Sequence, residues 1–523
     1  MKNTSLLLGF LFISQEVNGL STSFLPNRIS QRLPFYASTT DEVIETTNKV
    51  NNEAEQVFYE TLDKVDSQHE KSSFQSSLAS EDIDRNDTPI PRYEPLYGND
   101  AYNNKPIAYR SIGSNEEDKI LSNDAMQSIK SSADKYWNEN KEAQEDSRFT
   151  LQFKGNSEIH LDDLCSYNPS IKPLLNSVLK EKVYPLLRKA FHSQEYQLCI
   201  YDALYVRYDA DKALEYYVNV TGASQPLHRD LGLYSVNIAL NNDFEGGGTF
   251  FENAIEKNAI LKPVAPGHCL IHNSWERHAG VPTTKGIRDI IVLFVSSRQY
   301  PNQGAPIMER FARVKGMLRP LPVSQRIYTM NKLIHMAKEL HVEEISYGEA
   351  FLWLGFDLMQ KHEYEVQEYS MEEKVIQRYR DMNDAIDAFT KGTELLPNDA
   401  RGYFHLASAS DMRLKYVQQY IDLINDTTPL DLQTEVEGII SKYEKCIHLE
   451  RIYTTSGLKQ GDDWMEACVR LGTVYASYGN FVSALETFEG ILELHHENRF
   501  NVPSHILDEA RRAIEFCKGR IHL

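Results

Sequence analysis

The feature that most constrains the fold of this chain is a change in its hydrophobic pattern at about Leu198. From there to Val295, apolar residues alternate with polar ones in runs of about five to eight residues, and Gly, Asn and Pro separate the runs. Short alternating runs of this kind are typical of a closed antiparallel sheet such as a jelly roll. We therefore expect a double-stranded β-helix here, with its ligands held in the open mouth.

Ligand-type side chains lie at the start of one of these runs. His228 and Asp230 are two positions apart, and on an extended strand residues i and i+2 point to the same face. With His278 they make two histidines and one carboxylate, the ligand set of the facial triad that holds Fe(II) and leaves positions open. Arg288 begins the last apolar run, and its guanidinium can bind the far carboxylate of a 2-oxo dicarboxylate through two parallel hydrogen bonds.

Six short segments within roughly 204–295 together form a recognisable pattern. They are VRYDA (206–210), HRD (228–230), SVNIALN (235–241), FEGGGTFF (244–251), APGHCLIH (265–272) and HAGVPTTKGIR (278–288). With them the sequence resembles the 2-oxoglutarate and Fe(II)-dependent dioxygenases of the prolyl 4-hydroxylase and procollagen lysyl hydroxylase type, and the glycine trio and last segment are closest to the lysyl hydroxylase branch.

The resemblance implies a role for each matching residue. His228, Asp230 and His278 would bind the iron, and Arg288 would anchor 2-oxoglutarate. Tyr208, on the strand before the first ligand, would add a hydrogen bond to this co-substrate. The cofactors implied are Fe(II), 2-oxoglutarate and L-ascorbate. The reaction implied is hydroxylation, because halogenating relatives lack the carboxylate that Asp230 provides.

Other interpretations of these residues are weaker. The HRD segment also occurs in the kinase catalytic loop, where an Asn follows the Asp by five residues. Ser235 stands at that position, and the sequence has neither a preceding G-x-G-x-x-G nor a following D-F-G. His268 and His272 are interpreted as strand residues with satisfied hydrogen bonds, because only His278 occupies the family position.

Composition limits the partners of the protein. The 523 residues, 41% of them hydrophobic, allow about two to four domains with real cores. The 55 basic and 75 acidic residues give a net charge of −20, which disfavours nucleic acid and anionic membranes and favours a basic peptide. Six cysteines without C-x-x-C spacing argue against a zinc module and a dense disulfide scaffold, but leave room for one or two bridges.

The N-terminus has the layout of a targeting sequence. Residues 1–19 (MKNTSLLLGFLFISQEVNG) read as a secretory signal peptide, since the apolar run is too short to span a bilayer. Residues 20–95 read as a disordered linker, although their start, rich in Ser, Thr and Arg, also fits a transit peptide. We expect the secretory pathway, either the endoplasmic reticulum lumen or secretion, with a plastid reached through a bipartite presequence as the alternative. Stable membrane insertion is not expected.

Helical patterns lie on both sides of the predicted barrel. From Tyr97 to Ser193 apolar residues recur at helical spacing, and we expect helices that buttress the barrel in a dioxygenase domain at 96–305. Residues 306–523 are helical and repeat at tetratricopeptide spacing, which predicts a solenoid. Its pattern residues are Leu471, Gly472, Tyr475, Ala484 and Phe488, with Ala385, Phe389, Gly392, Pro397, Tyr403, Leu406, Ala407, Tyr443 and Cys446 in earlier units, a half-repeat at Ala350–Leu358 and a capping helix at Ser504–Cys517.

The sequence therefore predicts a multi-domain α+β protein: a jelly-roll oxygenase followed by an all-α repeat domain. The function it favours is hydroxylation of a prolyl or lysyl side chain on a peptide or protein. Two alternatives stay open, a non-catalytic peptide-binding adaptor built on the helical repeats and a dioxygenase acting on a small metabolite. The sequence does not choose between proline and lysine or give the oligomeric state.

Overall fold

The computed structural model describes residues 60, 76–79, 90–99, 105–113, 115–140, 156–192, 197–216, 222–230, 232–255, 260–297, 321–361, 370–424, 431–455, 463–496 and 502–521. The predicted signal peptide and most of the predicted linker at 20–95 lie outside these residues. Two parts of that linker are described. Ser77 donates its backbone N–H to Asp162, and Tyr93 begins a strand, so the folded region extends upstream of residue 96.

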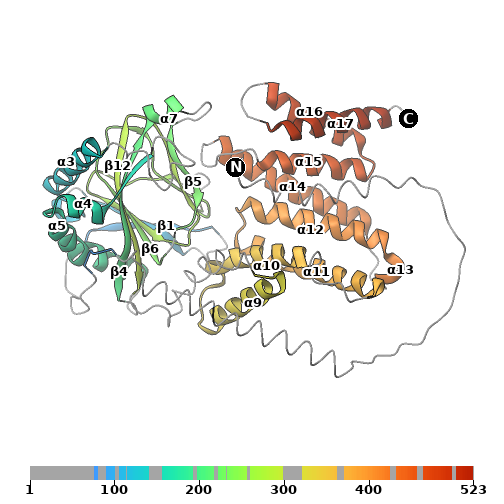
Figure 1. Cartoon of the computed structure of the whole chain (residues 1–523), viewed down its shortest axis with the longest axis horizontal. Coiled ribbons are helices and arrows are strands. Elements are labelled where there is room, and N and C mark those ends of the chain that lie inside the picture. Colours follow the sequence, from blue (N-terminus) through green and yellow to red (C-terminus); the bar gives the residue numbers. More distant parts are fainter. Residues whose placement is uncertain are drawn as a thin grey trace, which may run out of the picture. The chain divides into compact units, whose positions relative to one another are not determined.

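Two antiparallel sheets occupy the described chain between Tyr93 and Ser297 (Figure 1). One sheet has seven strands in the order β1-β2-β10-β6-β12-β4-β3, and the other has five, β5-β11-β8-β9 with β7 beside β11. The strands are β1 (Tyr93–Tyr97), β2 (Pro106–Ser111), β3 (Asn156–His160), β4 (Leu198–Asp209), β5 (Ala223–His228), β6 (Tyr234–Ala239), β7 (Glu245–Gly246), β8 (Thr249–Phe251), β9 (Ile260–Leu261), β10 (Cys269–Asn273), β11 (His278–Lys285) and β12 (Ile287–Ser297).

Alternation along the strands separates the two faces of the larger sheet. On β12, Ile291, Leu293 and Val295 belong to a core shared with the preceding helices. Ile290 and Val292, which alternate with these residues along the strand, line a cavity on the opposite face. Because successive strand side chains point to opposite faces, one face binds the helices and the other faces the smaller sheet.

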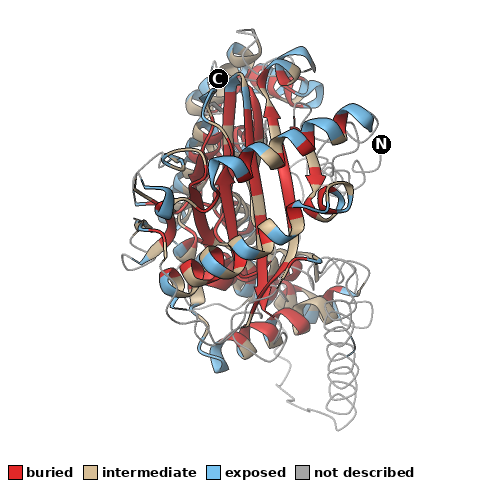
Figure 2. Ribbon diagram, turned by 90° about the vertical axis from the view of Figure 1, so that its left-hand side faces the viewer, coloured by how far each residue is buried: buried red, intermediate tan, exposed pale blue. Residues whose placement is uncertain are grey.

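Helices cover the outer face of the larger sheet, as Figure 2 shows. They are α3 (Asn123–Glu139), α4 (Leu161–Tyr167), α5 (Ile171–Val178) and α6 (Tyr184–Phe191), with a π-helical turn at Leu179–Val183 and a 3-10 turn at Glu116–Asp118. The expected helices are present between Tyr97 and Ser193, and the same segment also contains two strands that were not predicted, β2 and β3. Their five or six residues pair with β10 and β4, partners far along the chain, and a local pattern does not show such pairing.

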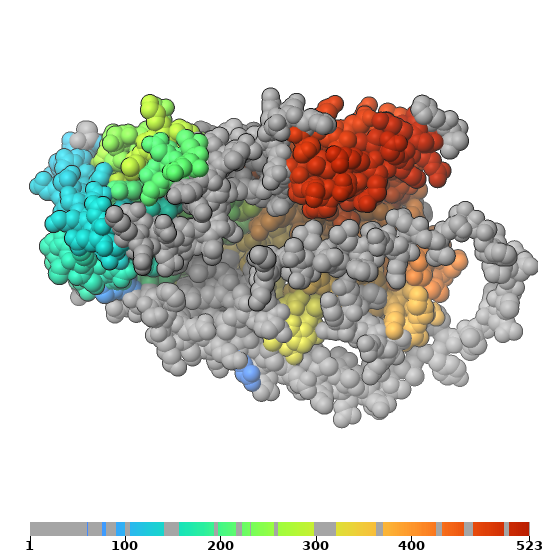
Figure 3. Space-filling model, turned by 45° about the horizontal axis from the view of Figure 1, so that its top comes forward, coloured from blue at the N-terminus to red at the C-terminus, as the bar shows by residue number. Residues whose placement is uncertain are grey.

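Residues after Leu321 form helices that pack in chain order. They are α9 (Val323–Glu339), α10 (Gly348–Gln360), α11 (Met371–Leu395), α12 (Ala400–Gln419), α13 (Ile421–Ile424), α14 (Leu432–Thr455), α15 (Asp463–Ser477), α16 (Phe481–His496) and α17 (Ser504–Ile521); a 3-10 turn (Glu344–Tyr347) precedes α10, and α7 (Ala210–Tyr216) follows β4. The helices α15, α16 and α17 share one core and form a continuous block, red in Figure 3.

Glycines allow close packing at two helix pairs. A Cβ on Gly355 of α10 would lie 2.7–2.9 Å from the Phe389 ring of α11. A Cβ on Gly472 of α15 would lie 2.6–2.9 Å from the Phe488 ring of α16. The same contact of a small and a large residue therefore recurs in separate pairs of neighbouring helices.

The six cysteines all lie in the described chain, are buried and form no disulfide bond with one another. The bridges for which the sequence left room are therefore not formed. Burial raises the pKa of the Cys269 and Cys468 thiols to about 12. Across the described ranges, no helix combines the length and apolar character that crossing a membrane requires.

Candidate metal centre

The smaller sheet brings two histidines face to face. His228 is the last residue of β5 and His278 the first of β11, and they are direct partners in the ladder between these strands. Opposed residues on neighbouring strands point to the same side, and their ring centroids are 4.3 Å apart. Asp230 follows β5, where its backbone N–H donates to Ser274 at 3.0 Å.

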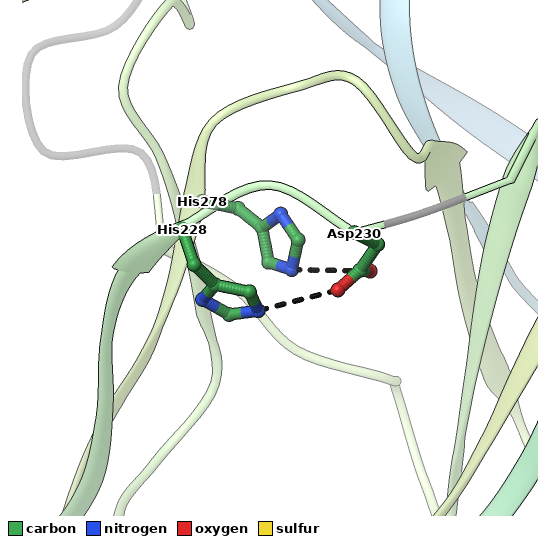
Figure 4. A group of neighbouring side chains, drawn as sticks. All are labelled: His228, Asp230 and His278. Atoms are coloured by element: carbon green, nitrogen blue, oxygen red, sulfur yellow. Dashed lines mark ion pairs between the residues drawn. The ribbon is translucent and has the colours of Figure 1, made fainter. Parts of the chain in front are cut away.

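The Asp230 carboxylate faces both imidazoles (Figure 4). Its Oδ1 is 3.3 Å from His228 Nε2, and its Oδ2 is 3.5 Å from His278 Nε2. One ligand atom from each of the three residues lies within 4.8 Å of the others. Ser235 donates its hydroxyl to Asp230 Oδ2 at 2.5 Å, which orients the carboxylate.

Backbone carbonyls fix the tautomer of both histidines. His228 Nδ1 lies 2.7 Å from the carbonyl of Pro226, and His278 Nδ1 lies 2.9 Å from that of Glu276. A carbonyl only accepts hydrogen bonds, so each Nδ1 carries the proton and each Nε2 is directed at the shared point.

The electrostatics of this group suit a cation. Burial lowers the pKa of His278 well below its ordinary value, so this imidazole is neutral. Burial also opposes ionisation of Asp230, but the neighbouring histidines lower the pKa of Asp230 below its usual range. A neutral Nε2 and a carboxylate oxygen, both acceptors, therefore face each other at 3.5 Å. A divalent cation bound to both atoms removes this repulsion, so the three residues fit a metal of the Fe(II) class.

Arg288 and Tyr208 lie together on the facing sheet. They are direct partners between β12 and β4, and the guanidinium lies 5.0 Å from the centre of the Tyr208 ring. Arg288 is buried, its Nη1 reaches the Gly248 carbonyl at only 3.4 Å, and no described carboxylate lies within ion-pair distance of it. Burial lowers the pKa of Arg288 and raises that of Tyr208 to about 12. This guanidinium is suited to an anion supplied from outside the chain.

All five residues predicted for the site line one cavity. Both sheets contribute to it, and its remaining walls are Glu158, Leu204, Val206, Gln225, Asn237, Thr249, Gly280, Ile290, Val292 and Phe294. Tyr208 donates its hydroxyl to Gln225 Oε1 at 3.3 Å inside this cavity. The predicted residues are thus gathered at one place, with the histidines and Asp230 on one side and Arg288 on the other.

The glycine trio makes room for Arg288. Gly246, Gly247 and Gly248 have φ angles of +77°, +66° and +114°, which side chains other than glycine adopt rarely. A Cβ on Gly247 would lie 3.0 Å from Arg288 Cδ and 2.8 Å from the Phe244 ring.

Three residues near the centre were not predicted. His272, interpreted from the sequence as an ordinary strand residue, is buried on β10 with its ring centroid 4.3 Å from that of His278. Arg229 lies between two of the predicted ligands, and Arg277 directly precedes the third. Their adjacency to the ligands was a signal in the sequence, but it did not show what they contact.

Sequence comparison finds similarity to lysyl hydroxylases. The chain is 36% identical over 104 residues to "Procollagen-lysine,2-oxoglutarate 5-dioxygenase 1" of Mus musculus, which covers 18% of this chain and 14% of that protein. It is 30% identical over 145 residues to the protein of the same name from Gallus gallus, covering 26% and 17%. The chain thus spans about a sixth of the length of these relatives, or less.

The solved structures that match this chain include two with low TM-scores. A prolyl-4-hydroxylase from Pseudomonas putida is 14% identical, with 34% of this chain and 90% of that chain covered and a TM-score of 0.24. AviO1 from Streptomyces viridochromogenes is also 14% identical, covers 40% and 93%, and has a TM-score of 0.26. No protein-family profile matches the sequence. What the comparisons establish is that a segment of this chain is a weak homologue of procollagen-lysine,2-oxoglutarate 5-dioxygenase 1.

Proposed function

We propose that this protein is an Fe(II)- and 2-oxoglutarate-dependent dioxygenase that hydroxylates a prolyl or lysyl side chain of a peptide or protein. One observation carries the proposal: two Nε2 atoms and a carboxylate meet in a cavity whose opposite wall holds a buried guanidinium without a carboxylate partner among the described residues. The similarity to lysyl hydroxylases supports the same chemistry.

His228, Asp230 and His278 would hold the metal through Nε2, a carboxylate oxygen and Nε2. When bound, Fe(II) and 2-oxoglutarate would activate O2, so that one oxygen atom of O2 enters a substrate C–H bond and the other enters the succinate that 2-oxoglutarate becomes as it loses CO2. The protein keeps the ligands ready: carbonyls hold the proton on each Nδ1, and Ser235 holds the carboxylate.

Arg288 would bind the distal carboxylate of 2-oxoglutarate, and the Tyr208 hydroxyl would donate a hydrogen bond to the same molecule. Burial strengthens both contacts, because a charge-assisted hydrogen bond gains energy away from water. The apolar side chains of Leu204, Val206 and Ile290 line the same cavity and would exclude water around the reacting atoms.

The parts of the chain take these roles in the proposal. Residues 96–305 would form a dioxygenase domain of double-stranded β-helix fold, supported by two antiparallel sheets that line one cavity. Residues 306–523 would form a tetratricopeptide-like domain that binds substrate peptide, supported by the recurring glycine and phenylalanine contacts. The net charge of −20 favours a basic peptide. We also propose that ascorbate serves as reductant. The proposed location is the secretory pathway, with a plastid as the alternative.

The test is anaerobic reconstitution of the full chain with Fe(II) and 2-oxoglutarate, followed by oxygen and measurement of succinate. We expect release of succinate that proline-rich or lysine-rich peptides stimulate, and none from Asp230→Ala. Peptide binding without succinate release would favour the non-catalytic adaptor. Stimulation by a free amino acid and by no peptide would favour a small-molecule substrate.

A further inference from the structure

A chain of six charged residues connects the two segments that carry the candidate ligands. It runs Arg229–Glu349–Arg401–Asp399–Arg277–Glu252, with N–O distances of 2.9, 2.9, 2.6, 3.2 and 2.7 Å in that order. Basic and acidic side chains alternate along it, three of each. Glu349 belongs to α10, Asp399 is the N-cap of α12 and Arg401 lies in its first turn, whereas the two outer arginines belong to the sheet region.

The outer arginines are the direct neighbours of the ligands. Arg229 lies between His228 and Asp230, and its Nη1 donates to the Trp275 carbonyl at 2.8 Å. Arg277 directly precedes His278. Adjacent residues of an extended chain point in opposite directions, so each arginine is directed away from the metal side. In that direction lie Glu349 for Arg229 and Asp399 for Arg277.

Apolar contacts join the same parts of the chain. Phe250 and Ala279 of the smaller sheet share a core with Ala400 and Ala407 of α12. The Phe250 ring packs against Tyr453 of α14, with centroids 5.9 Å apart. The helices therefore cover the outer face of the strands whose inner face holds the histidines.

Hydrogen bonds to backbone carbonyls hold this contact in one register. The Asn398 side chain donates to the Glu252 carbonyl at 2.7 Å, and the Tyr453 hydroxyl donates to the Asn398 carbonyl at 2.8 Å. Glu252 in turn donates its N–H to the Arg277 carbonyl at 3.0 Å. The start of α12 and the segment before His278 are thus linked through side chains and backbone at once.

We infer that the helices from α10 to α12 position the metal ligands. Glu349 acts as a positioning residue through Arg229. Asp399 does so through Arg277. The helices are then part of the metal centre, in addition to any role in binding substrate. This inference rests on the proposed metal site, because it concerns how that site is held.

The experiment uses Co(II), whose visible absorption reports ligand geometry, as a probe in place of Fe(II). The full chain is compared with Glu349→Gln and Asp399→Asn. Asn caps a helix as well as Asp does, so the second variant loses the charge and keeps the cap of α12. We expect each variant to bind Co(II) about 10- to 100-fold more weakly and to show a shifted band, as when support of a metal ligand is lost.

The matched control is Asp357→Asn. Asp357 also lies on α10 and forms a buried ion pair, with Arg326 of α9 at 2.8 Å, that includes no strand residue. Its loss should lower the thermal unfolding temperature and leave the Co(II) affinity and band unchanged. If Glu349→Gln or Asp399→Asn fails to fold, Arg401→Gln replaces that variant. Arg401 is more exposed, pairs with both Glu349 and Asp399, and contacts neither ligand segment.

The outcomes separate the two proposals. If the unaltered chain does not bind Co(II), the proposed function falls and this inference falls with it. If the unaltered chain binds Co(II) and the folded variants match it in affinity and band, the inference is overturned and the proposed function stands. An equal loss of affinity in Asp357→Asn would also overturn it, since the effect would then be general destabilisation.

Discussion

His228 and His278 occupy directly opposed positions in the antiparallel ladder between β5 and β11. Their Nε2 atoms approach the two oxygens of one carboxylate. The metal centre is therefore set by the pairing of two strands, and a slip of one residue would turn one histidine to the opposite face. The contacts of Arg229 and Arg277 with α10 and α12 add constraints against such a slip.

Replacement of His278 by Ala should abolish metal binding, since the site loses one of three ligands. We expect the Co(II) affinity to fall by more than about 100-fold, beyond the effect of losing a supporting contact. Titration followed by absorption measures this. His268→Ala is the control, because His268 bonds Ser111 and lies outside the ligand cluster. Unchanged affinity in His278→Ala would remove this histidine from the ligand set.

Arg288→Ala should leave metal binding intact and weaken 2-oxoglutarate by about 2–5 kcal/mol, the cost of leaving one charge of a buried pair without its partner. Arg288→Lys should fall between this variant and the unaltered chain, because Lys keeps the charge but lacks the planar fork. Calorimetric titration of 2-oxoglutarate into Co(II)-loaded protein distinguishes the three. Equal affinities would show that the anchor lies elsewhere.

Gly247→Ala should weaken 2-oxoglutarate without changing the metal ligands, because the new Cβ would displace Arg288 and Phe244. Its positive φ adds about 1–2 kcal/mol of strain. Gly479→Ala is a matched control: its φ is +84°, and a Cβ there meets nothing within 4 Å. Both variants should lose stability in urea titrations, and only Gly247→Ala should lose co-substrate affinity. A loss of affinity in both would point to strain alone.

Glu252 should make stability depend on pH. Burial, only partly offset by Arg277, raises the pKa of Glu252 from 4.5 to about 7. Between these values the folded protein holds a proton that the unfolded chain releases, so this group's contribution to the free energy of unfolding decreases as pH rises. Glu252→Gln removes that contribution. In urea unfolding at pH 4.5, 5.5 and 7, the free energy of unfolding of the variant should increase relative to that of the unaltered protein as pH rises. A difference between the two proteins that stays constant with pH would contradict the raised pKa of Glu252.

Gly472→Ala should destabilise the contact between α15 and α16 by about 1–3 kcal/mol, because its Cβ would overlap the Phe488 ring. Gly490→Ala serves as the control, since a Cβ at that helical position meets nothing within 4 Å. That change should stabilise the protein by about 0.5–1 kcal/mol. Thermal unfolding followed by circular dichroism gives both values, and equal effects would argue against close packing at Gly472.

Much of the centre could be predicted because its signals are local or recur in a known pattern. Spacing by two placed His228 and Asp230 together, the ligand types added His278 and Arg288, and resemblance added Tyr208; the fold gathers all five in one cavity. The glycine trio was part of the same pattern, and its positive φ angles now supply the physical reason for it.

What the sequence did not show depends on pairing between distant segments. Nothing in the spacing of charged residues indicates that Arg229 meets Glu349, since more than a hundred residues separate them. The short strands β2 and β3 were missed for the same reason, because their partners are β10 and β4. His272 was identified as a strand residue, but its contact with the His278 ring follows from the order of the strands.

The burial of all six cysteines provides a built-in reporter of unfolding. A thiol reagent reacts with the thiolate, and burial keeps Cys269 and Cys468 protonated at neutral pH. Cys269 belongs to β10, and Cys468 belongs to α15, so one labels the sheets and the other the helices. The rates at which a maleimide reaches them would therefore time the opening of the two regions in the unaltered protein.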